Sequence, residues 1–264
     1  MSDPITLQPT GKGVWELVLN NPERRNVLNE ATIEAFHQCL SDAEAEPTLR
    51  LLVLKAEGRH FCAGADLGWM QRAASLSPAQ NRADAGRLAE LLWRLDRFPH
   101  PTLALVQGAA FGGALGLVCA CDMVVAAADA RFCLSETRLG LIPATIAPYV
   151  LRVLGERQAR RYMLSGEVID AARAERLGLV HEVAESALAE GATPIITALL
   201  RGGPTAQRAA KALIRDYAGR PLSRALVSDS AQRLAALRVT EEAQEGLAAF
   251  LEKRPPGWEN KDDH

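Results

Sequence analysis

A run of 21 residues without a charged side chain, residues 101–121, constrains the fold of this chain more than any other feature. The run is nearly long enough to cross a bilayer, but Gln107 and four glycines interrupt it and no belt of aromatic residues flanks it. Residues 102–106 are typical of a buried strand, and Gly112 and Gly113 mark a loop that opens a helix over residues 114–121. We therefore predict a buried strand followed by a buried helix, and no membrane span.

The rest of the chain alternates between predicted strands and predicted helices. Short apolar runs predict further strands over residues 14–19, 51–54 and 123–127. Side chains able to cap a helix N-terminus are found at Asn29, Ser77, Asp170 and Thr240, and Gly178 is expected to end the helix that Asp170 begins. This alternation predicts an α/β fold with helices packed on mostly parallel sheets. A glycine-rich break at residues 201–204 separates a core of residues 1–200 from a helical region of residues 201–264.

Length and composition exclude several classes of protein. The 264 residues include 48% hydrophobic residues, enough for one sizeable core. The net charge is −2, so the chain has no excess of basic residues that would indicate binding to nucleic acid. The five cysteines are an odd number, and Cys119 and Cys121 lack the spacing of a zinc site, so we predict reduced thiols and no metal. Residues 1–4 contain no apolar targeting segment, and together with reduced thiols this predicts a cytoplasmic protein.

Two loops of small residues precede an isolated acidic residue, Glu136. The loops are residues 61–66 and 108–114, and small side chains there leave backbone N–H groups exposed. Two such N–H groups could bind a carbonyl oxygen while the carboxylate moves a proton. Simpler explanations stay open at this point: the glycines could serve helix–strand packing, Asp66 could cap a helix, and Glu136 could be a solvated surface residue.

In order and spacing, these segments resemble the crotonase family, also called the enoyl-CoA hydratase/isomerase family. The resemblance covers nearly the whole chain and is carried by residues 21–26, 61–67, 107–113, 121–122, 135–136, 139–143, 245–246 and 250–255. It implies an α/β spiral core of strand–strand–helix units and a C-terminal helical region used for trimer assembly. A homotrimer, or a dimer of trimers, is therefore expected.

The resemblance also implies where an acyl-CoA substrate binds. By this resemblance, the N–H groups of Ala65 and Gly113 are expected to form the oxyanion hole for the thioester carbonyl, and Glu136 is expected to transfer the proton. Coenzyme A is part of the substrate, so no separate cofactor is expected. Positions that match the coenzyme A site are Arg24, Arg25, Ala63, Asp66, Leu67, Phe250 and Lys253, although the side chains at 24, 25, 250 and 253 could instead be solvated helix ends. Positions expected around the acyl chain are Trp69, Met70, Leu115, Gly116, Arg138 and Ile146.

Two departures from the family pattern leave the reaction open. Gly116 stands where hydratases of the family carry the first of two glutamates that hold a water molecule, and residues 144–149 replace a glycine-rich stretch. A single carboxylate is the pattern of the family's enoyl-CoA isomerases. Residues 112–117, 135–136 and 147–149 nevertheless resemble bacterial hydratases of methylglutaconyl-CoA and isohexenylglutaconyl-CoA, which serve leucine and acyclic-terpene degradation.

We therefore predict a hydratase, a lyase that adds water to 3-methylglutaconyl-CoA or a longer relative. The second carboxylate of such a substrate could stand in for the missing glutamate or bind a cation such as Arg138. One alternative is an isomerase that shifts a 3-ene to a 2-ene. Another is an acyl-CoA or RNA binder without catalysis.

Overall fold

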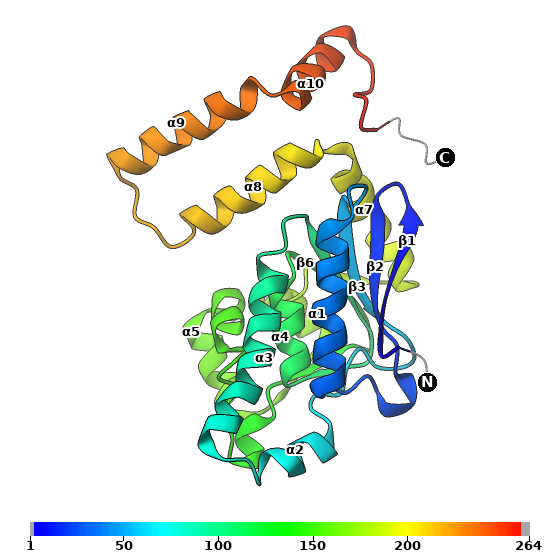
Figure 1. Cartoon of the computed structure of the whole chain (residues 1–264), viewed down its shortest axis with the longest axis vertical. Helices are drawn as coiled ribbons and strands as arrows, with labels where there is room; N and C mark the ends of the chain where they lie inside the picture. The colour runs from blue at the N-terminus through cyan, green and yellow to red at the C-terminus, as the bar shows by residue number, and fades with distance from the viewer. Residues whose placement is uncertain (1–2, 260–264) are drawn as a thin grey trace.

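The computed structural model describes residues 3–259, and its centre is a six-stranded sheet (Figure 1). The strands lie in the order β1–β2–β3–β4–β6–β9, with β1 antiparallel to β2 and every other neighbouring pair parallel. The mostly parallel sheet predicted from the alternating pattern is therefore confirmed. The bounds are β1 Ile5–Gly11, β2 Val14–Leu19, β3 Leu51–Ala56, β4 Thr102–Val106, β6 Met123–Ala127 and β9 Glu182–Ala184.

Helices cover both faces of this sheet. Leu52 and Leu54 pack into one hydrophobic cluster with α1, α3 and α4, whereas Val53 and Leu103 pack into a second cluster with α7. Since both faces are buried, residues 103–106 of β4 and all of β6 are apolar. Figure 1 shows α1, α3 and α4 side by side along the first face. The bounds are α1 Glu30–Ala45, α3 Pro78–Asp96, α4 Gly113–Ala120 and α7 Leu188–Arg201.

A second sheet of three strands carries the small-residue loops. Its order is β5–β7–β8, with β5 and β7 parallel and β8 antiparallel to β7. Cys62 bridges to Ala110 of β5, and Ala65 bridges to Leu28, so the loop at residues 61–66 joins this sheet to the segment before α1. The bounds are β5 Ala109–Phe111, β7 Arg131–Cys133 and β8 Val168–Asp170.

The predicted helix starts are confirmed by hydrogen bonds. The side chains of Asn29, Ser77, Asp170 and Thr240 each accept a bond from an N–H in the first turn of a helix. Gly178 follows α6 with φ of 74°, as predicted. Helices α5 and α7 were not predicted, because Gly155 interrupts α5 with φ of 68° and Pro194 lies inside α7. The bounds are α2 Leu67–Ala73, α5 Ala147–Ser165 and α6 Ala171–Arg176.

Residues 101–121 contain β4 and α4, as predicted. All seven residues of α4 after Gly113 are buried. Within residues 3–259, no helix combines the length and the apolar character that crossing a bilayer requires. Cys62, Cys119, Cys121 and Cys133 are buried, and burial raises the pKa of the Cys119 thiol to about 12. These cysteines behave as small buried hydrophobic residues, as predicted.

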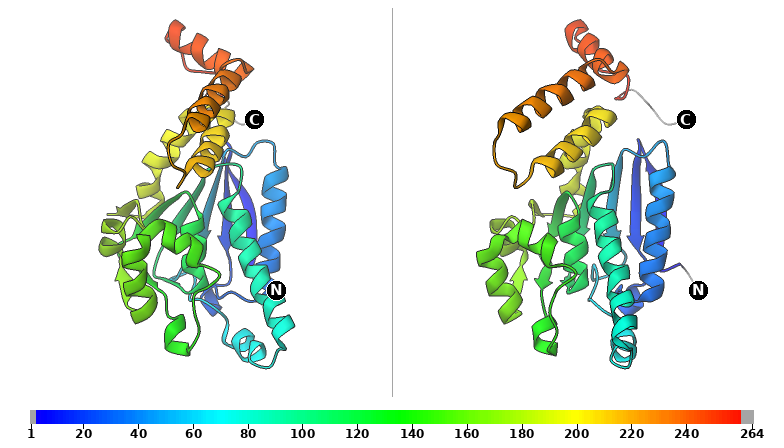
Figure 2. Two further views of the ribbon diagram at one scale, coloured as in Figure 1. Left: turned by 90° about the vertical axis from the view of Figure 1, so that its left-hand side faces the viewer. Right: turned by 60° about the vertical axis from the view of Figure 1, so that its left-hand side comes forward.

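Three C-terminal helices stand apart from the sheets, at the end of the molecule opposite α2 (Figures 1 and 2). They are α8 Pro204–Tyr217, α9 Arg224–Arg238 and α10 Glu241–Glu252, and the predicted boundary between residues 200 and 201 falls in the last turn of α7. The Glu242 carboxylate of α10 accepts hydrogen bonds from the N–H groups of Thr205 and Ala206, which caps α8. Large apolar side chains exposed in this region are Ile214, Leu222, Val227, Leu234, Val239, Leu247, Phe250 and Leu251.

Candidate active site

The start of α4 brings a backbone donor close to a carboxylate. Gly112 has φ of 56° and ψ of −125°, a conformation that glycine adopts readily. A Cβ atom at Gly112 would lie 3.3 Å from Oε1 of Glu136, so the absence of a side chain lets that carboxylate approach the backbone. Gly113 is the first residue of α4, and its N–H therefore has no acceptor within the helix and lies at the positive end of the helix dipole.

Ala65 lies on an extended segment that packs against the start of α4. Leu28 donates to the carbonyl oxygen of Gly64 at 2.8 Å and accepts from the N–H of Asp66 at 2.8 Å. This parallel pairing turns the Ala65 N–H away from Leu28, and that N–H has no acceptor among residues 3–259. A Cβ atom at Gly113 would lie 3.1 Å from Cδ1 of the same Leu28. Two backbone donors without an acceptor among residues 3–259 therefore belong to segments that both contact Leu28.

Glu136 follows β7 at the first position of a short 3₁₀-helix, Glu136–Leu139. The residue is half-buried, and within the described part of the chain its Oε2 atom is fully buried without a hydrogen-bond partner. Burial raises the pKa of the Glu136 carboxyl group, because the charged form loses its water. The explanation of Glu136 as a solvated surface residue is therefore wrong, and the carboxylate is suited to taking up and releasing a proton.

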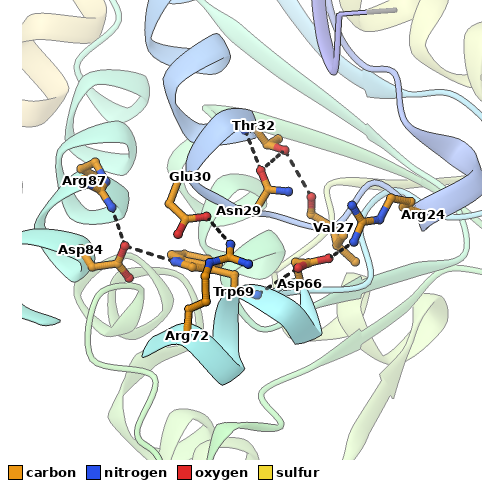
Figure 3. A network of polar contacts seen from close by, with 10 residues as sticks. All are labelled: Arg24, Val27, Asn29, Glu30, Thr32, Asp66, Trp69, Arg72, Asp84 and Arg87. Atoms are coloured by element: carbon orange, nitrogen blue, oxygen red, sulfur yellow. Dashed lines mark hydrogen bonds and ion pairs between the residues drawn. The ribbon is translucent and has the colours of Figure 1, made fainter. Parts of the chain in front are cut away.

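A polar network holds α2, the helix that directly follows Ala65 (Figure 3). The Asp66 carboxylate accepts from the N–H of Trp69 at 3.0 Å and pairs with Arg24 at 2.5 Å. The indole N–H of Trp69 donates to Asp84 of α3 at 3.1 Å, and Asp84 also pairs with Arg87. Asp66 is thus the N-cap of α2, one of the two roles left open by the sequence, and the network fixes the backbone just after Ala65.

The buried indole bond gives a stability prediction. Replacing Trp69 with phenylalanine is expected to lower the free energy of unfolding by about 1–3 kcal/mol, because Asp84 loses a buried donor. Trp93→Phe is the matched control, since Trp93 is on the exposed side of α3. Denaturant titration measures both, and equal effects in the two variants would show that the indole bond does not anchor α2.

The positions expected around the acyl chain range from fully buried to exposed. Leu115 and Ile146 belong to the main hydrophobic core, and a Cβ atom at Gly116 would lie only 2.4 Å from Cγ2 of Ile146. Trp69 is buried toward α3, and Met70 is half-buried. The exposed Arg138 side chain lies over Gly166, where a Cβ atom would be 2.9 Å from its Nε atom.

The positions expected to bind coenzyme A lie in different parts of the structure. Arg25 and Ala63 line a pocket of about 540 Å³, which also includes the cations Arg59 and Arg131 that the sequence analysis missed. Neither of these two arginines lies in a segment that carries the resemblance; in the sequence, Arg59 lies just before the loop at residues 61–66, and Arg131 lies beside neither loop. Leu67 is 76% exposed at the start of α2.

Phe250 and Lys253 lie at the end of α10, in the C-terminal region that Figure 1 shows opposite α2. Phe250 is 81% exposed. Within one chain the structure does not bring these two residues to Glu136. A different cavity, of about 550 Å³, lies between the core and α8 beside Asp122 and Lys211, and the lining of that cavity does not include Glu136, Ala65 or Gly113.

Comparison with known proteins finds similarity over nearly the whole chain. Residues 9–261 match the family model described as enoyl-CoA hydratase/isomerase. A crystal structure of an enoyl-CoA hydratase from Shewanella pealeana is 44% identical, with a TM-score of 0.93 and coverage of 97% of this chain and 96% of that chain. The structure of AtuE from Pseudomonas aeruginosa is 36% identical, with a TM-score of 0.92 and coverage of 97% and 100%.

A relative of named activity is the 2,3-dehydroadipyl-CoA hydratase of Escherichia coli. It is 35% identical over 251 residues, which cover 93% of this chain and 94% of that protein. The similarity in sequence and structure confirms the predicted crotonase fold and the prediction of a hydratase-type lyase. The chain belongs to the enoyl-CoA hydratase/isomerase family.

Proposed function

We propose that this enzyme hydrates an enoyl-CoA whose acyl group carries a second carboxylate, with 3-methylglutaconyl-CoA or a longer relative as the substrate. The observation that carries the proposal is the half-buried Glu136, whose Oε1 atom lies beside Gly112 at the start of α4 and whose Oε2 atom is buried without a partner among the described residues. The likeness to a 2,3-dehydroadipyl-CoA hydratase supports a dicarboxylic acyl group, because that substrate name also denotes a thioester with a distal carboxylate.

The proposed reaction uses three groups of this chain. The N–H groups of Ala65 and Gly113 donate to the thioester oxygen and stabilise the negative charge that develops on it. Glu136 takes a proton from the water molecule whose oxygen bonds to the β-carbon. The same carboxyl group then returns the proton to the α-carbon, so that water is added across the double bond and Glu136 is regenerated.

The second carboxylate of the substrate has a proposed role because position 116 carries none. A water molecule at the β-carbon needs more than one polar partner, and the substrate's own carboxylate can be the second. Arg138 is a candidate cation for that group, although its side chain lies over Gly166 in this structure.

Isomerisation is the second candidate, favoured by Gly116 and the single carboxylate. Turnover of crotonyl-, 3-methylglutaconyl- and 3-hexenoyl-CoA separates the possibilities, with absorbance of the thioester-conjugated double bond as the readout. Hydration removes that absorbance, and isomerisation of 3-hexenoyl-CoA creates it. Binding of coenzyme A without turnover of any of the three would favour a non-catalytic binder and contradict both proposals.

The raised pKa of Glu136 predicts how activity depends on pH. The base must be ionised to accept a proton, so kcat/KM for hydration is expected to fall as pH decreases, with a midpoint above the ordinary glutamate value of 4.5. A pH profile of initial rates measures this midpoint. A midpoint at or below 4.5 would contradict the burial of the ionised group.

The C-terminal helices expose large apolar side chains to solvent in the single chain. We propose that the exposed apolar side chains of α8 to α10 are covered in a homotrimer or a dimer of trimers, which would place Phe250 and Lys253 at the site of a neighbouring chain. Light scattering on the purified protein tests this assembly, and a monomer at micromolar concentration would contradict it.

We also propose a cytoplasmic location, which the five unpaired cysteines support.

A further inference from the structure

Gly116 and Ile146 compete for the same space. Gly116 lies in the first turn of α4, and Ile146 is the residue before α5. A Cβ atom at Gly116 would lie 2.4 Å from Cγ2 and 3.0 Å from Cβ of Ile146, and 3.2 Å from Cδ1 of Leu92. Separations below 3.0 Å do not occur between real side chains, so a residue larger than glycine at position 116 requires Ile146 to move.

Ile146 is 1% exposed and part of the main hydrophobic core, so displacing its side chain disturbs core packing. The two departures from the family pattern, at position 116 and at residues 144–149, are therefore in direct contact in this chain. A side chain is absent from α4, and a side chain that precedes α5 fills its place.

We infer that Ile146 is a specificity-determining residue that keeps a second protein carboxylate, at position 116, out of this site. The inference rests on the proposed function and deepens it. Ile146 and Leu92 present only carbon atoms toward Gly116. These carbon atoms offer a water molecule no hydrogen-bond partner, whereas an ordered water molecule needs two to four such partners. Simple enoyl-CoA thioesters without a polar acyl group are therefore poor substrates for hydration by this enzyme.

A double-mutant cycle on stability tests the packing part of the inference. Gly116→Glu alone is expected to shift the denaturation midpoint strongly downward, and Ile146→Gly is expected to remove much of that shift when the two are combined. Glycine is needed at 146 because the Cβ of an alanine would still lie 3.0 Å from the new Cβ. Gly86→Glu on α3 is the matched control, since a Cβ atom at Gly86 has no neighbour within 4 Å.

A smaller cycle protects the test against failure to fold. Gly116→Ala adds only the Cβ atom, and combining it with Ile146→Gly is expected to restore stability in the same way. If the effects at positions 116 and 146 are additive in both cycles, the two residues do not compete and the inference is wrong.

An activity measurement tests the specificity part. The combined variant Gly116→Glu/Ile146→Gly is expected to hydrate crotonyl-CoA at least 10-fold faster than the wild type, whereas Ile146→Gly alone is not. The pH profile of the combined variant is expected to show a second ionisation, because two carboxyl groups then share one site. Altered packing alone would not produce that ionisation.

The stability cycles and the activity measurement together distinguish a failure of this inference from a failure of the proposed function. Coupling in stability without a gain in crotonyl-CoA hydration would overturn the role of Ile146 in specificity. A wild type that turns over none of the three enoyl-CoA thioesters would overturn the proposed function, and the stability cycles would still decide whether Ile146 blocks position 116.

Discussion

Replacing Glu136 with glutamine is expected to lower turnover of an enoyl-CoA substrate by about 10²-fold or more. Glutamine keeps the size of the side chain but can neither accept nor return a proton at working pH. Because the proposed mechanism holds the thioester through backbone N–H groups, binding of a saturated acyl-CoA such as butyryl-CoA is expected to stay near the wild-type value. Initial rates and calorimetric titration measure the two quantities.

Two controls accompany the Glu136 variant. Glu156→Gln removes a carboxylate from the exposed surface of α5, where Glu156 pairs with Arg160, and should leave turnover unchanged. Stability is the second control. Since burial raises the pKa of folded Glu136, the contribution of this group to stability falls as pH rises through that pKa. Glu136→Gln should therefore be at least as stable as the wild type at pH 7. Near-normal turnover in a folded Glu136→Gln protein would remove Glu136 from the mechanism.

Replacing Gly113 with proline is expected to lower kcat by about 10²–10³-fold, the typical effect of losing one oxyanion-hole donor, or about 2.7–4 kcal/mol of barrier. Proline has no N–H, and the first position of a helix is the one where a helix tolerates proline best. The change therefore removes the proposed donor at the start of α4 while leaving the internal hydrogen bonds of the helix in place.

Gly113→Ala is the matched variant for this test. Alanine adds the same Cβ atom, which would lie 3.1 Å from the movable end of Leu28, but keeps the N–H. Steady-state kinetics on both variants, with thermal melting to confirm folding, separates the donor from the added bulk. Equal losses of kcat in the two variants would mean that the Gly113 N–H does not stabilise the transition state.

Local chemistry explains which features the sequence predicted well. Asn29, Ser77, Asp170 and Thr240 cap the helices expected of them, because a cap depends only on residues within one turn. The uncharged run at residues 101–121 forms β4 and α4, because a long apolar segment interrupted by glycines has few other stable arrangements. The order of the motifs was enough to indicate the family.

Short and irregular elements were missed for a physical reason. Four strands, β5, β7, β8 and β9, have three residues each, which is too few to show a hydrophobic periodicity. These strands form because neighbouring strands supply the partners for their backbone hydrogen bonds. The helix α5 contains a glycine with non-helical angles and α7 contains a proline, and packing against the core outweighs these breakers.

By itself, the sequence determined the fold class, the helix starts and the identity of one isolated glutamate. Only the tertiary structure decided that Glu136 is partly withdrawn from water beside Gly112, and that Ala65 and Gly113 meet at Leu28. Only the tertiary structure showed that Ile146 fills the space above Gly116, 30 positions earlier in the chain. Proximity, burial and a raised pKa arise between segments far apart in sequence, and they exist only once the chain has packed.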